Sequence, residues 1–135
     1  MNRLNGLTPL DEREGEGQAA QRGDRVLFNL RLFLNRGDEV LLNEKQAEYI
    51  PEERIRVVEG VKLIDRTITL GRREVIAGVE HALIGMKPGG YRKVRISPHL
   101  AYRDNGIPGL IPSAAVLVVD IWLREIIKPS TVAPS

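Results

Sequence analysis

The chain has 135 residues, 42% of them hydrophobic and 28% charged, which predicts one globular domain with a core of its own. It contains no cysteine, so disulfides and thiolate metal sites are excluded, and with only two histidines we do not expect a multi-histidine metal site. The formal net charge is only +2, and the arginines alternate with acids instead of gathering on one basic face. We therefore expect no cofactor, no metal and no nucleic-acid partner.

Both ends of the chain are polar. Residues 1–20 predict a flexible N-terminal arm and residues 128–135 a flexible C-terminal tail, which leaves a domain over residues 21–127. Neither the apolar stretch of a secretory signal nor an apolar run long enough to cross a bilayer is visible. The sequence thus predicts a cytoplasmic protein without a membrane partner.

Between these ends, apolar and polar residues mostly alternate with the period of two that is typical of half-buried strands. Residues 24–34 are the clearest case, because every second residue from Val26 to Leu34 is apolar. Further strands are predicted at residues 39–42, 55–61, 62–70, 91–96 and 115–126.

Residues 74–83 depart from this alternation. Ile76, Val79 and Leu83 recur at helical spacing, and Gly85 follows as a helix end. Because so short a helix is not stable alone in water, it must pack on the sheet. The predicted fold is α+β, with an antiparallel five- to six-stranded sheet wrapped around one short helix.

Three stretches of the C-terminal half carry a family resemblance. They are residues 71–80, 85–102 and 106–112, whose glycines, prolines and helix start follow one another without a gap up to the last predicted strand. Over residues 71–123 the chain resembles the FKBP family of peptidyl-prolyl cis-trans isomerases, and the N-terminal half matches more loosely. The resemblance implies an FKBP-like fold.

It also implies a function, which is to bind an X-Pro segment and accelerate rotation about its peptide bond. Uncatalysed rotation faces a barrier of about 18–20 kcal/mol and takes about 10–100 s at room temperature. Since no covalent bond is made or broken, an apolar pocket with a few hydrogen-bond donors is sufficient. The expected partners are therefore proline-containing peptides or unfolded protein segments.

The resemblance further implies which residues form the pocket. Tyr102 matches the family's tyrosine whose hydroxyl reaches a ligand carbonyl, and Ile76 matches the main-chain N–H donor, so we expect these two residues to be catalytic. An alternative for Tyr102 is a strand-end tyrosine with a satisfied hydroxyl. The expected substrate-binding residues are Glu74, Val75, Val79, Leu110, Ile111, Val119, Leu30 and Val40.

Several of these positions are aliphatic where the family has aromatic residues. Val79 replaces a tryptophan, Leu30 a tyrosine, Val40 a phenylalanine and Val119 an aromatic residue of the last strand. A wall of smaller side chains offers less apolar area, so we expect weaker binding and reduced activity. The alternative function is a non-catalytic protein- or peptide-binding chaperone module.

Two further features leave alternatives open. Residues 42–64 are longer than the family's usual connection, and their polar part, which contains Tyr49, either covers the pocket or forms a solvated bulge. Trp122 alternates away from the apolar residues of the last strand, so it faces outward. Either the N-terminal arm shields it or it contacts a protein partner.

Overall fold

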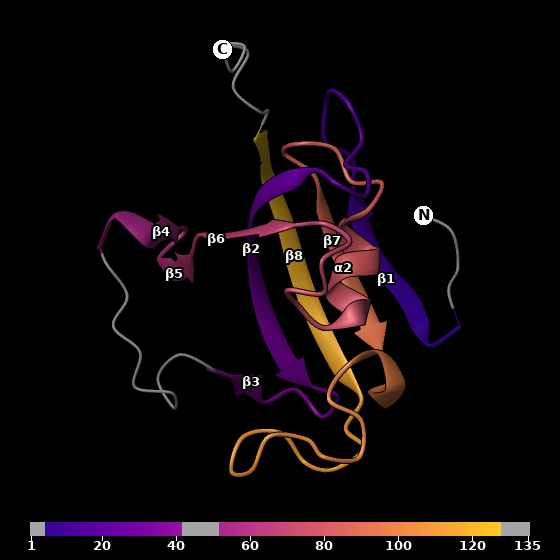
Figure 1. Ribbon diagram of the computed structural model, residues 1–135. Coiled ribbons are helices and arrows are strands. Elements are labelled where there is room, and N and C mark those ends of the chain that lie inside the picture. Colours follow the sequence, from indigo (N-terminus) through magenta and orange to yellow (C-terminus); the bar gives the residue numbers. More distant parts are fainter. Residues whose placement is uncertain (1–4, 42–51, 128–135) are drawn as a thin grey trace, which may run out of the picture.

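The computed structural model describes residues 5–41 and 52–127. Six strands form an antiparallel sheet in the order β1-β7-β8-β2-β3, and β6 pairs with β2 on the same side as β3 (Figure 1). The strands are β1 (Leu7–Arg13), β2 (Arg25–Leu34), β3 (Glu39–Val40), β6 (Arg66–Thr69), β7 (Tyr91–Ile96) and β8 (Leu117–Ile127). A separate hairpin contains β4 (Ile55–Val58) and β5 (Val61–Ile64), and short 3-10 turns span Glu52–Arg54 and Pro98–Leu100.

The core lies between the sheet and α2 (Ala77–Leu83). Alternate residues of the central strands face the helix and are buried, as the period of two predicts. They are Val26, Phe28, Leu32 and Leu34 of β2, Val94 and Ile96 of β7, and Leu117, Val119, Ile121 and Leu123 of β8. The predicted α+β fold with one short α-helix is thereby confirmed for the described residues.

The longest pairing, between β2 and β8, contains one irregularity. Leu27 pairs with Glu125 and Phe28 with Leu123, so Arg124 is an extra residue on β8. Such a β-bulge changes the direction of a side chain relative to regular alternation. Arg124 is half-buried and lies on the strand that also carries Trp122.

The helix is shorter than the predicted span of 74–83. Ile76 is its N-cap and has an extended conformation, with φ −58° and ψ 148°. Glu74 lies outside the helix, and its carboxylate accepts a hydrogen bond from the Thr69 N–H at 3.1 Å. At the other end Gly85 has a φ of +91°, which favours glycine and ends the helix as predicted.

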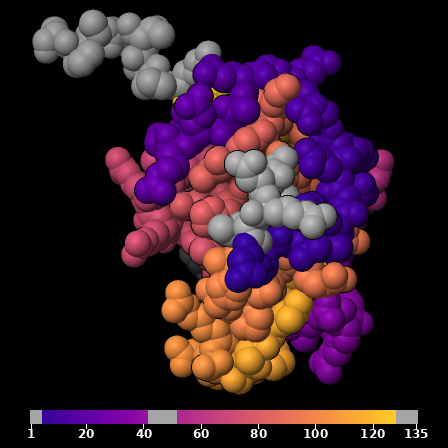
Figure 2. All heavy atoms as spheres, turned by 90° about the vertical axis from the view of Figure 1, so that its right-hand side faces the viewer, coloured from indigo at the N-terminus to yellow at the C-terminus, as the bar shows by residue number. Residues whose placement is uncertain are grey.

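The N-terminal segment differs from the predicted flexible arm. Leu7–Arg13 form β1, which pairs with β7 at the edge of the sheet, and both Leu7 and Ala20 are buried. Figure 2 shows these N-terminal residues, in indigo, packed along one side of the molecule. The remaining residues of β1 are exposed, so the strand depends on backbone pairing and carries no strong apolar alternation. Residues 128–135, the predicted tail, lie outside the described residues.

The segment predicted as strands 55–61 and 62–70 is divided differently. The turn of the β4–β5 hairpin lies at Glu59 and Gly60, whose φ values of 50° and 81° fit a two-residue type I′ turn. A further break at Asp65 separates β5 from β6. Residues 42–51, including Tyr49, lie outside the described residues. None of the described helices is long and apolar enough to cross a membrane.

Candidate functional site

The predicted pocket residues gather on the side of the sheet that α2 covers. All except Glu74 belong to one hydrophobic cluster or pack directly against it. Four are buried, namely Val40, Val79, Ile111 and Val119, and five are partly buried, namely Leu30, Val75, Ile76, Leu110 and Tyr102. Residues far apart in the sequence thus line one apolar region.

Ile76 occupies the start of α2. Its carbonyl oxygen accepts hydrogen bonds from the N–H groups of Val79 and Glu80, at 3.1 and 3.2 Å, and is therefore engaged by the helix. Within the described part of the chain, the Ile76 N–H is not donated to another backbone carbonyl. This main-chain donor is consequently available beside the hydrophobic cluster.

Tyr102 follows the 3-10 turn Pro98–Leu100. Its carbonyl oxygen accepts a hydrogen bond from the Gly106 N–H at 3.0 Å, which fixes the backbone on its C-terminal side. Burial raises the pKa of the Tyr102 hydroxyl, and the charge of Arg66 opposes this effect only in part. The hydroxyl therefore stays protonated and remains a donor over the physiological pH range.

The loop after Tyr102 is held in a compact form. Ile107 and Ile111 exchange two backbone hydrogen bonds, of 2.9 and 2.8 Å, and Ile111 is buried. A Cβ atom at Gly106 would collide with the Ile111 carbonyl oxygen, so this position requires glycine. The folded loop places the side chains of Ile111 and Leu110 against the core.

Val79 and Val119 lie at the bottom of the cluster. They are 2% and 0% exposed, respectively, and come from α2 and the middle of β8. Val40 lies on β3 and is paired with Leu32 of β2. The predicted aliphatic wall is therefore continuous with the domain core.

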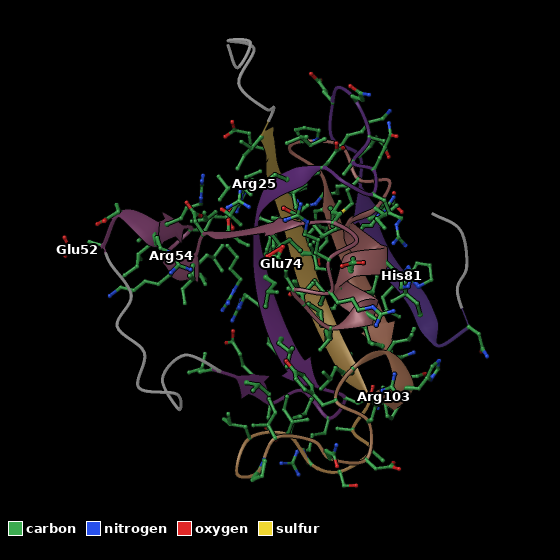
Figure 3. The ribbon with its side chains drawn as sticks, viewed as in Figure 1. Arg25, Glu52, Arg54, Glu74, His81 and Arg103 are labelled. Carbon is green, nitrogen blue, oxygen red and sulfur yellow. The ribbon has the colours of Figure 1, made fainter. Side chains whose placement is uncertain are left out.

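Glu74 is the one predicted substrate-binding residue outside the cluster. It is exposed, and Figure 3 shows it beside the segment that leads from β6 to α2. Its carboxylate bonds the Thr69 N–H, so the side chain stabilises this connection. The two histidines are exposed, and among the described residues no group of three His, Asp or Glu side chains is placed to hold a metal ion.

Trp122 faces the opposite side of the sheet, as its alternation predicts, and is half-buried. The shielding element is the β4–β5 hairpin, because Asn29 on this outer face donates hydrogen bonds to the Ile64 carbonyl and to Asp65, at 2.7 and 2.8 Å. The hairpin is not alone here, because Arg13 and Glu14 of the N-terminal segment line the same cavity as Trp122, although β1 itself extends the sheet edge.

The hairpin and the outer face of the sheet together line an open cavity of about 520 Å³. Sequence reasoning missed it, because the period-two pattern shows that residues 55–64 form strands but not where the hairpin packs. The Glu59-Gly60 pair at the turn was the one signal that could have indicated a hairpin.

Comparison with known proteins agrees with this arrangement. Residues 16–124 match the family model of FKBP-type peptidyl-prolyl cis-trans isomerase. The chain is 37% identical over 123 residues to FK506-binding protein 4 of Chaetomium thermophilum, which covers 91% of this chain and 22% of that protein. It is 31% identical over 121 residues to FK506-binding protein 1A of Neurospora crassa, covering 89% and 88% of the two chains.

The chain thus spans about a fifth of the length of the FK506-binding protein 4 relatives and most of the length of the shorter one. The matched segment contains most of the sheet, α2 and every predicted pocket residue. From the family model and these relatives together, the chain belongs to the FKBP-type peptidyl-prolyl cis-trans isomerase family.

Proposed function

We propose that the domain is a peptidyl-prolyl cis-trans isomerase that acts on X-Pro bonds of protein substrates and assists their folding. The observation that carries the proposal is the position of Tyr102 and Ile76. One contributes a protonated hydroxyl and the other a main-chain N–H, and both border the same hydrophobic cluster. Membership of the isomerase family supports the same activity.

The chemistry of rotation fits these groups. The twisted amide is less dipolar than the planar one, so an apolar surface formed by Val79, Ile111 and Val119 favours the transition state over the ground state. The Ile76 N–H and the Tyr102 hydroxyl would orient the carbonyl groups on either side of the prolyl bond. No nucleophile is required, since the reaction changes only a torsion angle.

The aliphatic walls predict a slower enzyme than an aromatic-walled relative. An aromatic side chain buries about 150–250 Å², and apolar area contributes about 25 cal/mol per Å². Losing part of this area at several positions removes about 1–3 kcal/mol of transition-state binding, or about five- to 160-fold in kcat/KM.

A protease-free isomerisation assay on X-Pro peptides tests the proposal. We expect measurable acceleration, and we expect Tyr102→Phe to lower kcat/KM several-fold while leaving the free energy of unfolding nearly unchanged, because Tyr102 is only partly buried and phenylalanine keeps its ring. Absence of acceleration with every residue tested before proline would overturn the proposal.

The second candidate is a non-catalytic binding module that keeps the apolar surface. The aliphatic residues Val79, Val119, Leu30 and Val40 favour it. NMR titration with an unfolded protein or a proline peptide separates the two functions. Shift changes around Ile76, Tyr102 and Ile111 without any rate acceleration would establish binding alone.

A further inference from the structure

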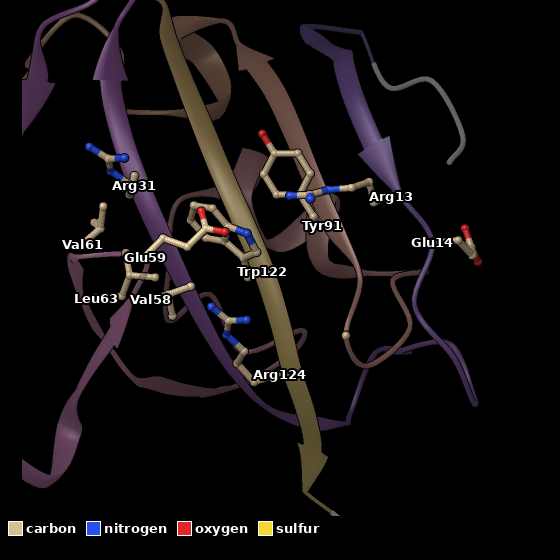
Figure 4. A pocket seen from close by; sticks show the side chains of 11 residues that line it. Arg13, Glu14, Arg31, Val58, Glu59, Val61, Leu63, Tyr91, Trp122 and Arg124 are labelled. Atoms are coloured by element: carbon tan, nitrogen blue, oxygen red, sulfur yellow. The ribbon is translucent and has the colours of Figure 1, made fainter.

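The outer face of the sheet carries the cavity of about 520 Å³, between the β4–β5 hairpin and strands β2, β7 and β8 (Figure 4). It lies on the face opposite α2, because Trp122 alternates with the buried core residues Ile121 and Leu123. The hydrophobic cluster of the proposed isomerase site is therefore not part of it. A volume in this range is typical of ligand-binding pockets.

Two aromatic rings form one wall of this cavity. Tyr91 and Trp122 are directly paired across β7 and β8, with ring centroids 5.4 Å apart and an interplanar angle of 40°. The Tyr91 hydroxyl donates a hydrogen bond of 2.6 Å to Asp120, which fixes the ring. Val58, on the hairpin opposite, is 37% exposed and adds an aliphatic surface.

Two guanidinium groups lie over these rings. The Arg13 guanidinium is 4.6 Å from the Tyr91 ring centroid and the Arg124 guanidinium is 5.9 Å from that of Trp122. Within residues 5–41 and 52–127, neither arginine forms an ion pair with a carboxylate. Of the acids that line the cavity, only Glu59 is left to balance them.

Other charges that line the cavity already have partners. Arg31 binds Glu39 through two hydrogen bonds of 2.8 and 2.9 Å, and Glu14 lies 3.3 Å from Lys87. The local charge therefore favours an anionic ligand at the two unpaired guanidinium groups.

Arg124 is positioned in an unusual way, because it is the extra residue of the β-bulge on β8. Its Nε donates a hydrogen bond of 2.6 Å to Asn29, whereas its Nη2 is buried and has no acceptor in the described part of the chain. Burial and the nearby charge of Arg56 lower the pKa of Arg124, and Asp65 opposes them. An unpaired buried donor is destabilising, so a ligand that brings an acceptor to this guanidinium is favoured.

We propose that this outer-face cavity binds an acidic segment of a protein partner, with carboxylates at Arg13 and Arg124 and an adjacent apolar side chain against Trp122 and Val58. Charge complementarity and the mixed aromatic and aliphatic walls select a peptide that alternates acidic and apolar residues. The acids Glu14, Glu59 and Asp120 on this face disfavour a polyphosphate strand, which needs a continuous basic surface.

Trp122 makes a direct experiment practical, since it is the one tryptophan of the chain and its fluorescence reports the cavity. The probe is the acetylated, amidated hexapeptide Glu-Leu-Asp-Phe-Glu-Leu, and its control replaces each acid by the matching amide. Neither contains proline. We expect saturable quenching or a spectral shift with the acidic peptide, binding at least about tenfold weaker with the amide peptide, and a loss of affinity as salt rises.

Matched arginine variants locate the interaction. Arg13→Gln and Arg124→Gln should each weaken binding about tenfold. Arg95→Gln removes the same charge from the same face but outside the cavity, and should leave the affinity within about twofold. Arg13 is exposed, so its variant stays informative even where Arg124→Gln impairs folding.

Several results would overturn the proposal. Equal affinity for acidic and amide peptides, or equal losses in Arg13→Gln and Arg95→Gln, would exclude recognition by the unpaired guanidinium groups. Phenylacetate binding as tightly as the hexapeptide would assign the cavity to small aromatic acids instead of a protein segment. The isomerisation rate of Arg13→Gln, expected to equal that of the parent chain, keeps this test separate from that of the proposed function.

Discussion

At the scale of single residues, Gly78 shows how closely the helix lies on the sheet. A Cβ atom at this position would meet Cγ2 of Ile96 at 2.5 Å and Cδ1 at 2.8 Å. Gly78 and Ile96 are both buried, so neither residue can move into solvent to relieve this contact. The absence of a side chain at Gly78 therefore sets the separation between α2 and β7.

We expect Gly78→Ala to destabilise the domain by about 1–3 kcal/mol through overpacking, although alanine favours the helix by about 1 kcal/mol relative to glycine. Urea unfolding measures the change. In an Ile96→Ala background the same substitution should cost much less, because the colliding atoms are gone. An equal cost in both backgrounds would mean that Ile96 is not the obstacle.

Arg92 is a buried cation that joins three elements. Its Nη1 donates hydrogen bonds to the carbonyl oxygens of Ala82 and Ile84 at the end of α2, at 2.8 and 3.1 Å. Its Nη2 lies 3.5 Å from the Glu12 carboxylate on β1. The positive charge also stands at the helix C-terminus, where the helix dipole favours it.

We expect Arg92→Met to lower the free energy of unfolding by about 2–4 kcal/mol, because it leaves one buried and one partly buried carbonyl group unpaired. Glu12→Gln should cost less than about 1 kcal/mol, since Glu12 is partly exposed and its contact is long. Denaturant unfolding of both variants checks the order. A larger effect of Glu12→Gln would show that the ion pair, not the helix end, is the important contact.

At the scale of elements, the β4–β5 hairpin is attached through one polar cluster. Asp65 accepts hydrogen bonds from Asn29 at 2.8 Å and from Arg56 at 2.9 and 3.2 Å. Burial alone would raise the pKa of Asp65, but the hydrogen bonds from Arg56 and Asn29 and the charges of Arg56 and Arg124 outweigh it and lower this pKa. The ionised form of Asp65 therefore stabilises the folded state.

Because the folded-state pKa of Asp65 is depressed, its contribution is present above the unfolded-state pKa of about 3.9 and is lost as pH falls through the folded-state pKa. We expect Asp65→Asn to destabilise the domain by about 1–2 kcal/mol at neutral pH and to match the parent chain more closely as the pH falls below the unfolded-state pKa. Unfolding curves across this range test it. Asp38→Asn, in an exposed pair with Arg36, should change little at any pH.

The elements also show where a sequence is informative. The strands at residues 24–34 and 91–96 were predicted closely, because each buries alternate residues on one face. β1 was missed, since only Leu7 of its residues is buried and backbone hydrogen bonds to β7 carry no side-chain pattern. The helix start was placed three residues early, because Ile76 is apolar and lies at helical spacing yet adopts the extended N-cap conformation.

At the scale of the whole molecule, the two faces of the sheet differ in how far a sequence can predict them. The resemblance over residues 71–123 supplied the register for eight of the ten predicted pocket residues, and the looser N-terminal match supplied Leu30 and Val40. The structure brings nine of the ten together on the helix side. The outer cavity was not predictable, because it depends on long-range contacts of the hairpin with Asn29 and on the bulge at Arg124. Neither the hairpin contact nor the bulge produces a recognisable pattern in the local sequence.

The burial of each wall position decides where an aromatic side chain can be introduced into the proposed isomerase site. Val119 is 0% exposed and is surrounded by core residues, so Val119→Phe should destabilise the domain by about 1–3 kcal/mol through overpacking. Leu30 is only partly buried, so Leu30→Tyr can place its ring at the edge of the cluster with little cost.

We therefore expect Leu30→Tyr to raise kcat/KM for X-Pro peptides about threefold to tenfold, because the larger ring adds apolar area where substrate binds. Leu27→Tyr, on the same strand but on the outer face, should leave the rate unchanged and serves as the control. The protease-free assay and urea unfolding are measured together for each variant. An equal rate change in both variants would mean that Leu30 does not border the bound substrate, and that the aliphatic wall is not what limits the activity.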